Sequence, residues 1–303
     1  MKQVLSKNLN DEELLYKALE GLEKGHRVAI AVIIEKIGSG PRKPGAKMVI
    51  YDDGRYFGTL GGGVFERMVL EHALQAIKKG KPRIERYSFS GDETRHVKTH
   101  ETGLLCGGTI TVYIDVLKPV PRAFIVGAGR IGKPLADLLN MLGFKIMIAD
   151  PNKDLLSKEI FPYAQELIHG TPEYIGKYIE EKVRPSDIVF IVHGETNVDV
   201  PVLKHVLKSK APFIGVLGSK RKVIEYAKIL VREGIPLDDI VNKVRAPIGI
   251  DIGAETPEEI AVSVVAQVIS WIHGVEKDSF KTLNIMNSNT VIDLLRKEVE
   301  DKE

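Results

Sequence analysis

The chain has 303 residues, of which 44% are hydrophobic and 28% are charged. That length gives room for two domains of ordinary size, and that composition is typical of a folded globular protein and excludes a largely disordered one. Lysine and arginine number 43 against 41 acidic residues, so the charge balance argues against nucleic acid or an anionic membrane as the main partner.

The N-terminal segment is polar and amphipathic and lacks the apolar stretch of a secretory signal. No run of about 18 or more apolar residues occurs, so the sequence predicts no membrane span. Cys106 is the only cysteine, which excludes a disulfide framework or a multi-cysteine zinc site within one chain. We therefore expect a reducing, cytoplasmic setting.

Residues 1–118 are predicted to form a small α+β domain. Strands joined by a hairpin at Asp52-Asp53-Gly54, with the helices kept apart, are typical of a mostly antiparallel sheet. The predicted elements are a helix over 11–24, strands over 27–37, 46–51 and 55–60, a helix from Gly61 to about Lys79, and strands over 83–89 and 109–117.

A proline-spaced linker at 118–122 leads into a second predicted domain, 122–274. Its apolar runs AFIVG, KIMIAD, QELIHG, DIVFIVH and PFIGVLG are each followed by a helix-like stretch, which predicts a doubly wound parallel sheet of the Rossmann type. Thr256-Pro257-Glu258-Glu259 has the N-cap, proline and glutamate that begin a helix. Residues 275–303 are predicted to be a polar tail with a short helix.

A nucleotide site is predicted where the first Rossmann strand meets its helix. Gly127-Ala128-Gly129-Arg130-Ile131-Gly132 fits G-x-G-x-x-G, and Asp150 ends the next strand, near the spacing at which an acidic residue meets ribose hydroxyls. The glycines permit close backbone approach, and the helix N-terminus favours a pyrophosphate. An Asp150 carboxylate would repel a 2′-phosphate, so an NAD-like dinucleotide is favoured. A glycine-rich turn without a ligand, with Asp150 as a helix cap, is the alternative.

Further candidates follow later strands of this sheet. His193 ends the fourth strand, and Gly218 and Ser219 follow the fifth, just before three consecutive cations. Cations oppose the dipole at a helix N-terminus, so a bound anion would compensate them. A solvated basic helix start explains the same residues, and both hypotheses stay open.

Three loops of the front domain are candidates too. Arg42 lies in a glycine- and proline-rich loop, and Gly61-Gly62-Gly63 opens a helix, so either could accept an anion, or be an ordinary connection or hinge. Cys106 precedes Gly107 and Gly108 and could be a thiolate that ligates a soft metal, with His96 and His100 as further ligands, or a small buried hydrophobe.

The order of these motifs resembles one family. GSGPRKPGAKMVI, GTLGGGVFE and LLCGG are similar to the N-terminal domain of the XdhC/CoxI family. GAGRIG with IADP, FIGVLGSKRK and APIGIDIGAETPEEIAVSV are similar to its C-terminal Rossmann domain. The resemblance implies a xanthine dehydrogenase accessory factor, which binds the molybdenum cofactor while its terminal sulfur is installed and delivers it to an apoenzyme of the xanthine dehydrogenase or carbon monoxide dehydrogenase type.

Carried over residue by residue, the resemblance makes Cys106 the cofactor contact, with Gly107, Gly61–Gly63 and Arg42 as its neighbours. It implies a molybdenum hydroxylase and a sulfurtransferase as partners, and a cofactor that could be in dinucleotide form. One departure concerns a Thr-His-x-His motif ahead of an aspartate. Here His193 is kept, the second histidine is replaced by Glu195, and Asp199 is one position further away.

Two other function classes stay open. An NAD-dependent oxidoreductase is compatible with the glycine pattern and with His193, although no further acid–base group is evident and a fold does not fix a function. A Rossmann scaffold used only for protein interaction would explain the basic run at 220–222 but not the front-domain loops. We expect a chaperone more than a catalyst, and a homodimer formed through the apolar helix over 262–271.

Overall fold

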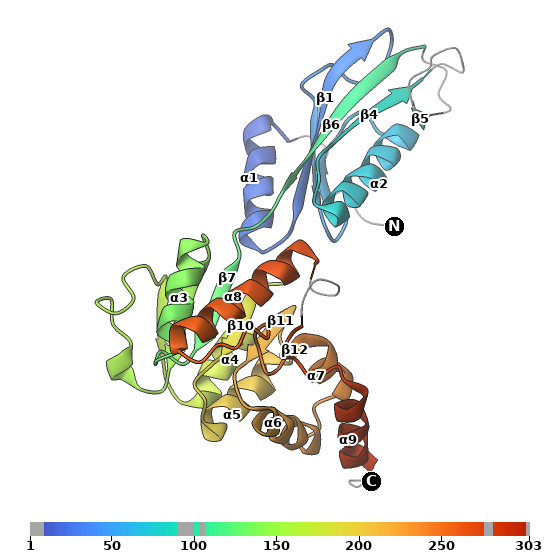
Figure 1. The fold of residues 1–303 in the computed structure, drawn as a ribbon. Coiled ribbons are helices and arrows are strands. Elements are labelled where there is room, and N and C mark those ends of the chain that lie inside the picture. Colours follow the sequence, from blue (N-terminus) through green and yellow to red (C-terminus); the bar gives the residue numbers. More distant parts are fainter. Residues whose placement is uncertain (1–8, 90–99, 103–106, 276–280, 301–303) are drawn as a thin grey trace. The chain divides into compact units, whose positions relative to one another are not determined.

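The structure, a computed structural model, describes residues 9–89, 100–102, 107–275 and 281–300 (Figure 1). The chain divides into two compact units, Met1–Pro119 and Val120–Glu303. Among the described residues no helix is long and apolar enough to cross a membrane.

The first unit is built on one six-stranded sheet with the order β3-β2-β1-β6-β4-β5. All neighbouring strands are antiparallel except β4 and β5. The predicted α+β domain with a mostly antiparallel sheet is therefore confirmed. Its elements are α1 (Asp11–Glu23), β1 (Val28–Ile37), β2 (Lys47–Tyr51), β3 (Tyr56–Gly58), α2 (Gly63–Lys79), β4 (Arg83–Ser88), β5 (His100–Glu101) and β6 (Thr109–Leu117).

Side chains that alternate along the strands form one apolar layer on each face of this sheet. On β2, Met48 and Ile50 pack in the layer that contains the α2 side chains, whereas Val49 and Tyr51 pack in the layer that contains Leu14 of α1. Successive side chains of a strand point to opposite faces, so each helix covers one face of the sheet (Figure 1).

The second unit has a six-stranded, fully parallel sheet with the order β12-β11-β10-β7-β8-β9. If the strands of this unit are numbered 1 to 6 from β7 and the sheet is read from β9 to β12, the order is 3-2-1-4-5-6. This is the strand order of a Rossmann domain, so the predicted fold is confirmed. Its elements are β7 (Arg122–Val126), α3 (Gly132–Met141), β8 (Lys145–Asp150), a 3-10 turn (Lys153–Leu155), β9 (Glu166–His169), α4 (Pro172–Lys182), β10 (Ile188–Ile191), α5 (Thr196–Val206), β11 (Phe213–Val216), α6 (Lys220–Arg232), α7 (Leu237–Lys243), β12 (Val244–Arg245), α8 (Pro257–His273) and α9 (Asn289–Glu300).

Both faces of this sheet are covered. Phe124 and Val126 of β7 belong to the apolar cluster that includes α4, α5 and α6, whereas Ala123 and Ile125 belong to the cluster that includes α3 and α8. A strand that is buried on both faces needs a continuous run of apolar residues. Such runs are visible in the sequence, so the strands could be predicted from it.

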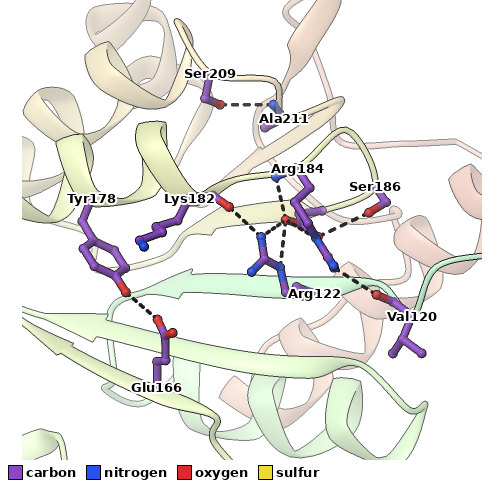
Figure 2. A network of polar contacts seen from close by, with 10 residues as sticks. Val120, Arg122, Glu166, Tyr178, Lys182, Arg184, Ser186, Ser209 and Ala211 are labelled. Atoms are coloured by element: carbon purple, nitrogen blue, oxygen red, sulfur yellow. Dashed lines mark hydrogen bonds and ion pairs between the residues drawn. The ribbon is translucent and has the colours of Figure 1, made fainter. Parts of the chain in front are cut away.

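The amino ends of β7 and β10 are joined by a buried ionic network (Figure 2). The Asp187 carboxylate is fully buried and pairs with Arg122 at 2.6 Å and with Arg184 at 2.9 Å. Arg184 also donates to the carbonyl of Val120 at 3.2 Å, and Arg122 donates to that of Lys182 at 2.6 Å. The network ties the start of the unit to its sheet and leaves the opposite, carboxyl edge to the loops.

Candidate functional site

Two glycines of the loop after β7 are required by packing. Gly127 has a φ of +111°, and a Cβ placed on it would lie 2.6 Å from the backbone nitrogen of His193. A Cβ on Gly132 would lie 1.7 Å from the carbonyl oxygen of Gly127. The loop after β7 and the loop after β10 therefore touch at the point where the strand order reverses, which is where open α/β sheets bind ligands.

Gly129 is different, because packing does not explain it. A Cβ on this residue would meet nothing within 4 Å, and its φ lies outside the left-handed region that favours glycine. The neighbouring Arg130 side chain is exposed. Helix α3 begins with Ile131 at its N-cap, and no described side chain caps it. Open space, bare backbone and an uncapped helix N-terminus together suit a phosphate group.

Asp150, the residue predicted to contact ribose, is only 1% exposed. One of its carboxylate oxygens accepts the N–H of Ala128 at 2.7 Å, and the other accepts the N–H of Asn152 at 2.8 Å. In this conformation Asp150 fastens the glycine loop to the end of β8. Nothing in the described part of the chain tests a ribose hydroxyl at this buried carboxylate, so the ribose contact stays a prediction.

The other predicted residues of this unit lie at the same edge. His193 follows β10, and Gly218 and Ser219 follow β11. The Ser219 hydroxyl accepts the N–H of Lys222 at 3.3 Å and so caps α6. The Nδ1 atom of His193 is buried and makes no hydrogen bond within the described residues. A buried ring nitrogen without a partner is unusual and is available to a ligand.

Sequence reasoning missed an ionisable cluster beside His193. Asp199 is fully buried and accepts the N–H of Gly194 at 3.1 Å and the Tyr226 hydroxyl at 3.0 Å. Burial raises the pKa of Asp199 to about 6, although the Tyr226 hydrogen bond and the charges of His193 and Lys222 oppose that rise. Burial also raises the pKa of Tyr226. The sequence held one signal, because Asp199 stands close to the family's aspartate position, but nothing in it pairs that residue with Tyr226.

The sixth strand of this sheet, β12, covers only Val244 and Arg245. Further along the chain, Ile250 makes an isolated bridge to Thr282. Asp251 forms an exposed ion pair with Lys281, which holds the pKa of its carboxyl below the ordinary value.

In the first unit, the glycine-rich loops converge. A Cβ on Gly108 would lie 1.9 Å from the carbonyl oxygen of Ser39, and a Cβ on Gly61 would lie 2.3 Å from the Cβ of Pro41. The loop that carries Arg42 is thus in contact with both of the other glycine segments. The Arg42 side chain is exposed and has no ion-pair partner among the described residues.

The segment Gly61–Gly63 already has an internal anion. The buried carboxylate of Glu66 accepts the Thr59 hydroxyl at 2.5 Å and the N–H groups of Leu60 and Gly62 at 3.1 Å each, all at one oxygen. The Gly62 N–H is therefore not available to a ligand in this conformation. An external anion would have to use the neighbouring backbone or the Arg42 guanidinium.

Cys106 and His96 lie outside the described residues, and only the backbone of His100 is described. Gly107, which follows the cysteine, is exposed with a φ of +71°, and its N–H donates to the carbonyl of Phe89 at 3.0 Å. The part of the chain that the structure covers contains no group of three potential metal ligands. The metal-ligating role of Cys106 stays a prediction.

Two family models match the chain. The XdhC and CoxI family model matches residues 21–88, and the XdhC Rossmann domain model matches residues 123–268. Each matched range falls within one of the two compact units.

Three curated proteins are similar over long stretches. Uncharacterized protein YqeB of Escherichia coli is 36% identical over 242 residues, which is 80% of this chain and 43% of that protein. A probable xanthine dehydrogenase subunit of Bacillus subtilis is 31% identical over 53% of this chain and 46% of its own length. The molybdenum cofactor insertion chaperone PaoD of E. coli is 24% identical over 88% of this chain and 90% of its own length. The chain thus spans less than half the length of the first two relatives.

Proposed function

The chain belongs to the XdhC and CoxI family, and on that premise we propose that it is an accessory factor that binds the molybdenum cofactor and delivers it to a molybdenum hydroxylase. The names of two relatives support the proposal, since one is a molybdenum cofactor insertion chaperone and the other a probable xanthine dehydrogenase subunit. The client is an enzyme of the xanthine dehydrogenase or carbon monoxide dehydrogenase type, and a sulfurtransferase is a second partner. The setting is a reducing cytoplasm.

The observation that carries the proposal is the open space at Gly129. Because no described atom other than those of its chain neighbours lies within 4 Å of its Cβ position, this glycine leaves room for a group that is not part of the chain. The cofactor is a pyranopterin with an anionic phosphate, and a dinucleotide form has a pyrophosphate. Either anion suits the bare backbone of Gly127–Gly132 and the N-terminus of α3.

The first unit has groups of its own that suit a molybdenum cofactor. A Cys106 thiolate is a soft ligand, and Gly107, the next residue in the chain, is exposed. Arg42 supplies an exposed guanidinium on a loop that touches both Gly61 and Gly108. In this role the chain holds and transfers its cargo and needs no turnover of its own.

An NAD-dependent oxidoreductase is the second candidate, and one observation favours it. His193, Asp199 and Tyr226 give the carboxyl edge of the Rossmann sheet titratable groups that acid–base chemistry could use. Such an enzyme would retain NAD on purification and change its absorbance at the reduced-nicotinamide band with substrate. A chaperone would retain a pterin.

Equilibrium dialysis of the purified protein with molybdenum cofactor tests the proposal. We expect binding by the wild type and clear weakening in Cys106→Ser and in Gly129→Ala. Met141→Ser is the matched control, because it removes a sulfur from an exposed side chain (80% exposed) at the end of α3 that lies away from the glycine loop. No binding by the wild type, or equal binding by Cys106→Ser and Met141→Ser, would contradict the assigned role.

A further inference from the structure

A cavity of about 330 Å³ lies at the carboxyl edge of the Rossmann sheet, between the first turns of α5 and α6. These helices follow β10 and β11, which lie on one side of β7 in the sheet. The strand that ends at Asp150, β8, lies on the other side of β7, so the cavity and Asp150 belong to different halves of the sheet. It is lined by Thr196, Ser219, Arg221, Lys222, Glu225 and Tyr226.

The lining of this cavity favours a negatively charged group. Arg221 and Lys222 bring two cations, and Thr196 and Ser219 bring two hydroxyls. Arg221 is exposed and has no ion-pair partner among the described residues. A guanidinium beside an ammonium, both in the first turn of a helix, is unfavourable without a counter-charge.

The acidic groups nearby do not supply that counter-charge fully. Asp199 does not line the cavity, and its carboxylate is already engaged by the N–H of Gly194 and by the hydroxyl of Tyr226, which does line it. Lys222 donates to the carbonyl of Gly194 and lies over the Tyr226 ring, 5.7 Å from its centroid. Glu225 is the one further acidic residue in the lining, against two cations.

His193, which does not itself line the cavity, precedes Gly194, whose carbonyl accepts a hydrogen bond from Lys222 of the lining. The Nδ1 atom of His193 is buried without a hydrogen-bond partner in the described part of the chain, and His193 is close enough to Asp199 for its charge to affect that carboxyl. Native structures pair buried nitrogens of this kind with protein, water or ligand.

From these observations we infer that the cavity is a phosphate-binding subsite, separate from the glycine loop after β7, in which Arg221, Lys222, Thr196 and Ser219 contact a phosphate group. The same charges repel the positively charged nicotinamide ring of NAD⁺, which a Rossmann dehydrogenase would place over this half of its sheet. A ligand that spans the sheet edge would therefore be anionic at both ends. The assignment does not depend on the ligand being the molybdenum cofactor.

The test uses inorganic phosphate as the probe and the full chain at constant ionic strength, with binding followed by the ³¹P line width. We expect Arg221→Gln to weaken phosphate binding at least about fivefold, the effect of one charge-assisted hydrogen bond. Lys220→Gln removes a neighbouring cation of the same helix that does not line the cavity, and should change binding less than about twofold.

Gly129→Ala closes the glycine loop, so the phosphate that still binds to this variant reports the proposed subsite. We expect such binding to remain, and Arg221→Gln added to Gly129→Ala should weaken it at least about fivefold. Loss of all phosphate binding in Gly129→Ala would leave the glycine loop as the phosphate site and overturn the proposal. So would the absence of wild-type phosphate binding, or equal weakening by Lys220→Gln and Arg221→Gln, which would indicate diffuse attraction by surface charge. This experiment contains no molybdenum cofactor. A negative result would therefore overturn the phosphate subsite and leave the proposed function untouched.

Discussion

Close backbone packing explains why the loop after β7 needs a glycine at position 132. In Gly132→Ala the new Cβ would lie 1.7 Å from the carbonyl oxygen of Gly127, and backbone atoms on both sides cannot give way as a side chain could. We expect this variant to lose about 3 kcal/mol or more of unfolding free energy in urea titrations. An unfolding midpoint equal to that of the wild type would show that the loop has another packing.

The paired change Gly129→Ala should behave in the opposite way. Its Cβ meets nothing within 4 Å and its φ suits an L residue, so the unfolding free energy should stay within about 0.5 kcal/mol of the wild type. The extra methyl group would nevertheless occupy the space that a nucleotide phosphate needs. We therefore expect the affinity for ADP, measured by calorimetry, to fall at least about tenfold. Unchanged ADP affinity would remove the glycine loop from the binding site.

Asp199 makes stability depend on pH. Because burial raises its folded pKa from 3.8 to about 6, the folded protein keeps the proton at pH values where the unfolded chain has released it. The contribution of Asp199 to the unfolding free energy is therefore fully present below about pH 4 and is lost as the pH rises to about 6. The loss is at most about 3 kcal/mol. Urea titrations between pH 4 and pH 7 measure it.

Asp199→Asn supplies the comparison. An amide has no proton to release, yet its oxygen can still accept the Gly194 N–H. The difference in unfolding free energy between wild type and variant should therefore change with pH in that window. Parallel pH profiles for the two proteins would mean that Asp199 keeps an ordinary pKa.

The sequence identified residues of the site but not how they pair. The G-x-G-x-x-G pattern located all three glycines, yet only the folded backbone separates Gly127 and Gly132, which packing requires, from Gly129, which it does not. Likewise Asp150 was predicted as a ribose contact, whereas both of its oxygens accept backbone N–H groups. Contacts between residues distant in sequence, such as Asp199 with Tyr226, have no local signature.

Elements were predictable where the physical signal is local. The capping box of α8, Thr256 with Glu259, is present as expected, and the five apolar strands β7 to β11 form the predicted parallel sheet. The sixth strand, β12, has no such local signal, because two residues, Val244 and Arg245, are too few to show a period. It is defined by its pairing with β11.

The junction of β7 and β10 depends on Asp187. Asp187→Ala removes the buried carboxylate with which Arg122 and Arg184, both largely buried, form their ion pairs, so we expect a loss of about 3 kcal/mol or more of unfolding free energy. Asp293→Ala is the control, because its pair with Arg296 is exposed on both sides and should contribute less than about 0.5 kcal/mol. Similar unfolding midpoints for the two variants would contradict a structural role for the buried network.

On the scale of the whole molecule, the chain places two kinds of glycine loop on two compact units. One unit gathers the loops around Arg42, Gly61 and Gly108, and the other has the open space at Gly129. Sequence motifs predicted both sets because each set is local to its own unit. No local pattern in the sequence reports which surfaces associate, and self-association must be tested directly.

We propose that α8 mediates a homodimer. Its outer surface exposes Val262, Ile269 and Ile272, of which the first two are seven residues apart and so lie on one face of the helix. A twofold interface would bury the same face on both copies, so one added charge enters it twice. We expect sedimentation velocity to give a dimer for the wild type and a monomer for Ile269→Glu. Val299→Glu, which charges an exposed apolar position on α9, should remain dimeric. A monomeric wild type, or a dimer that survives Ile269→Glu, would exclude this face.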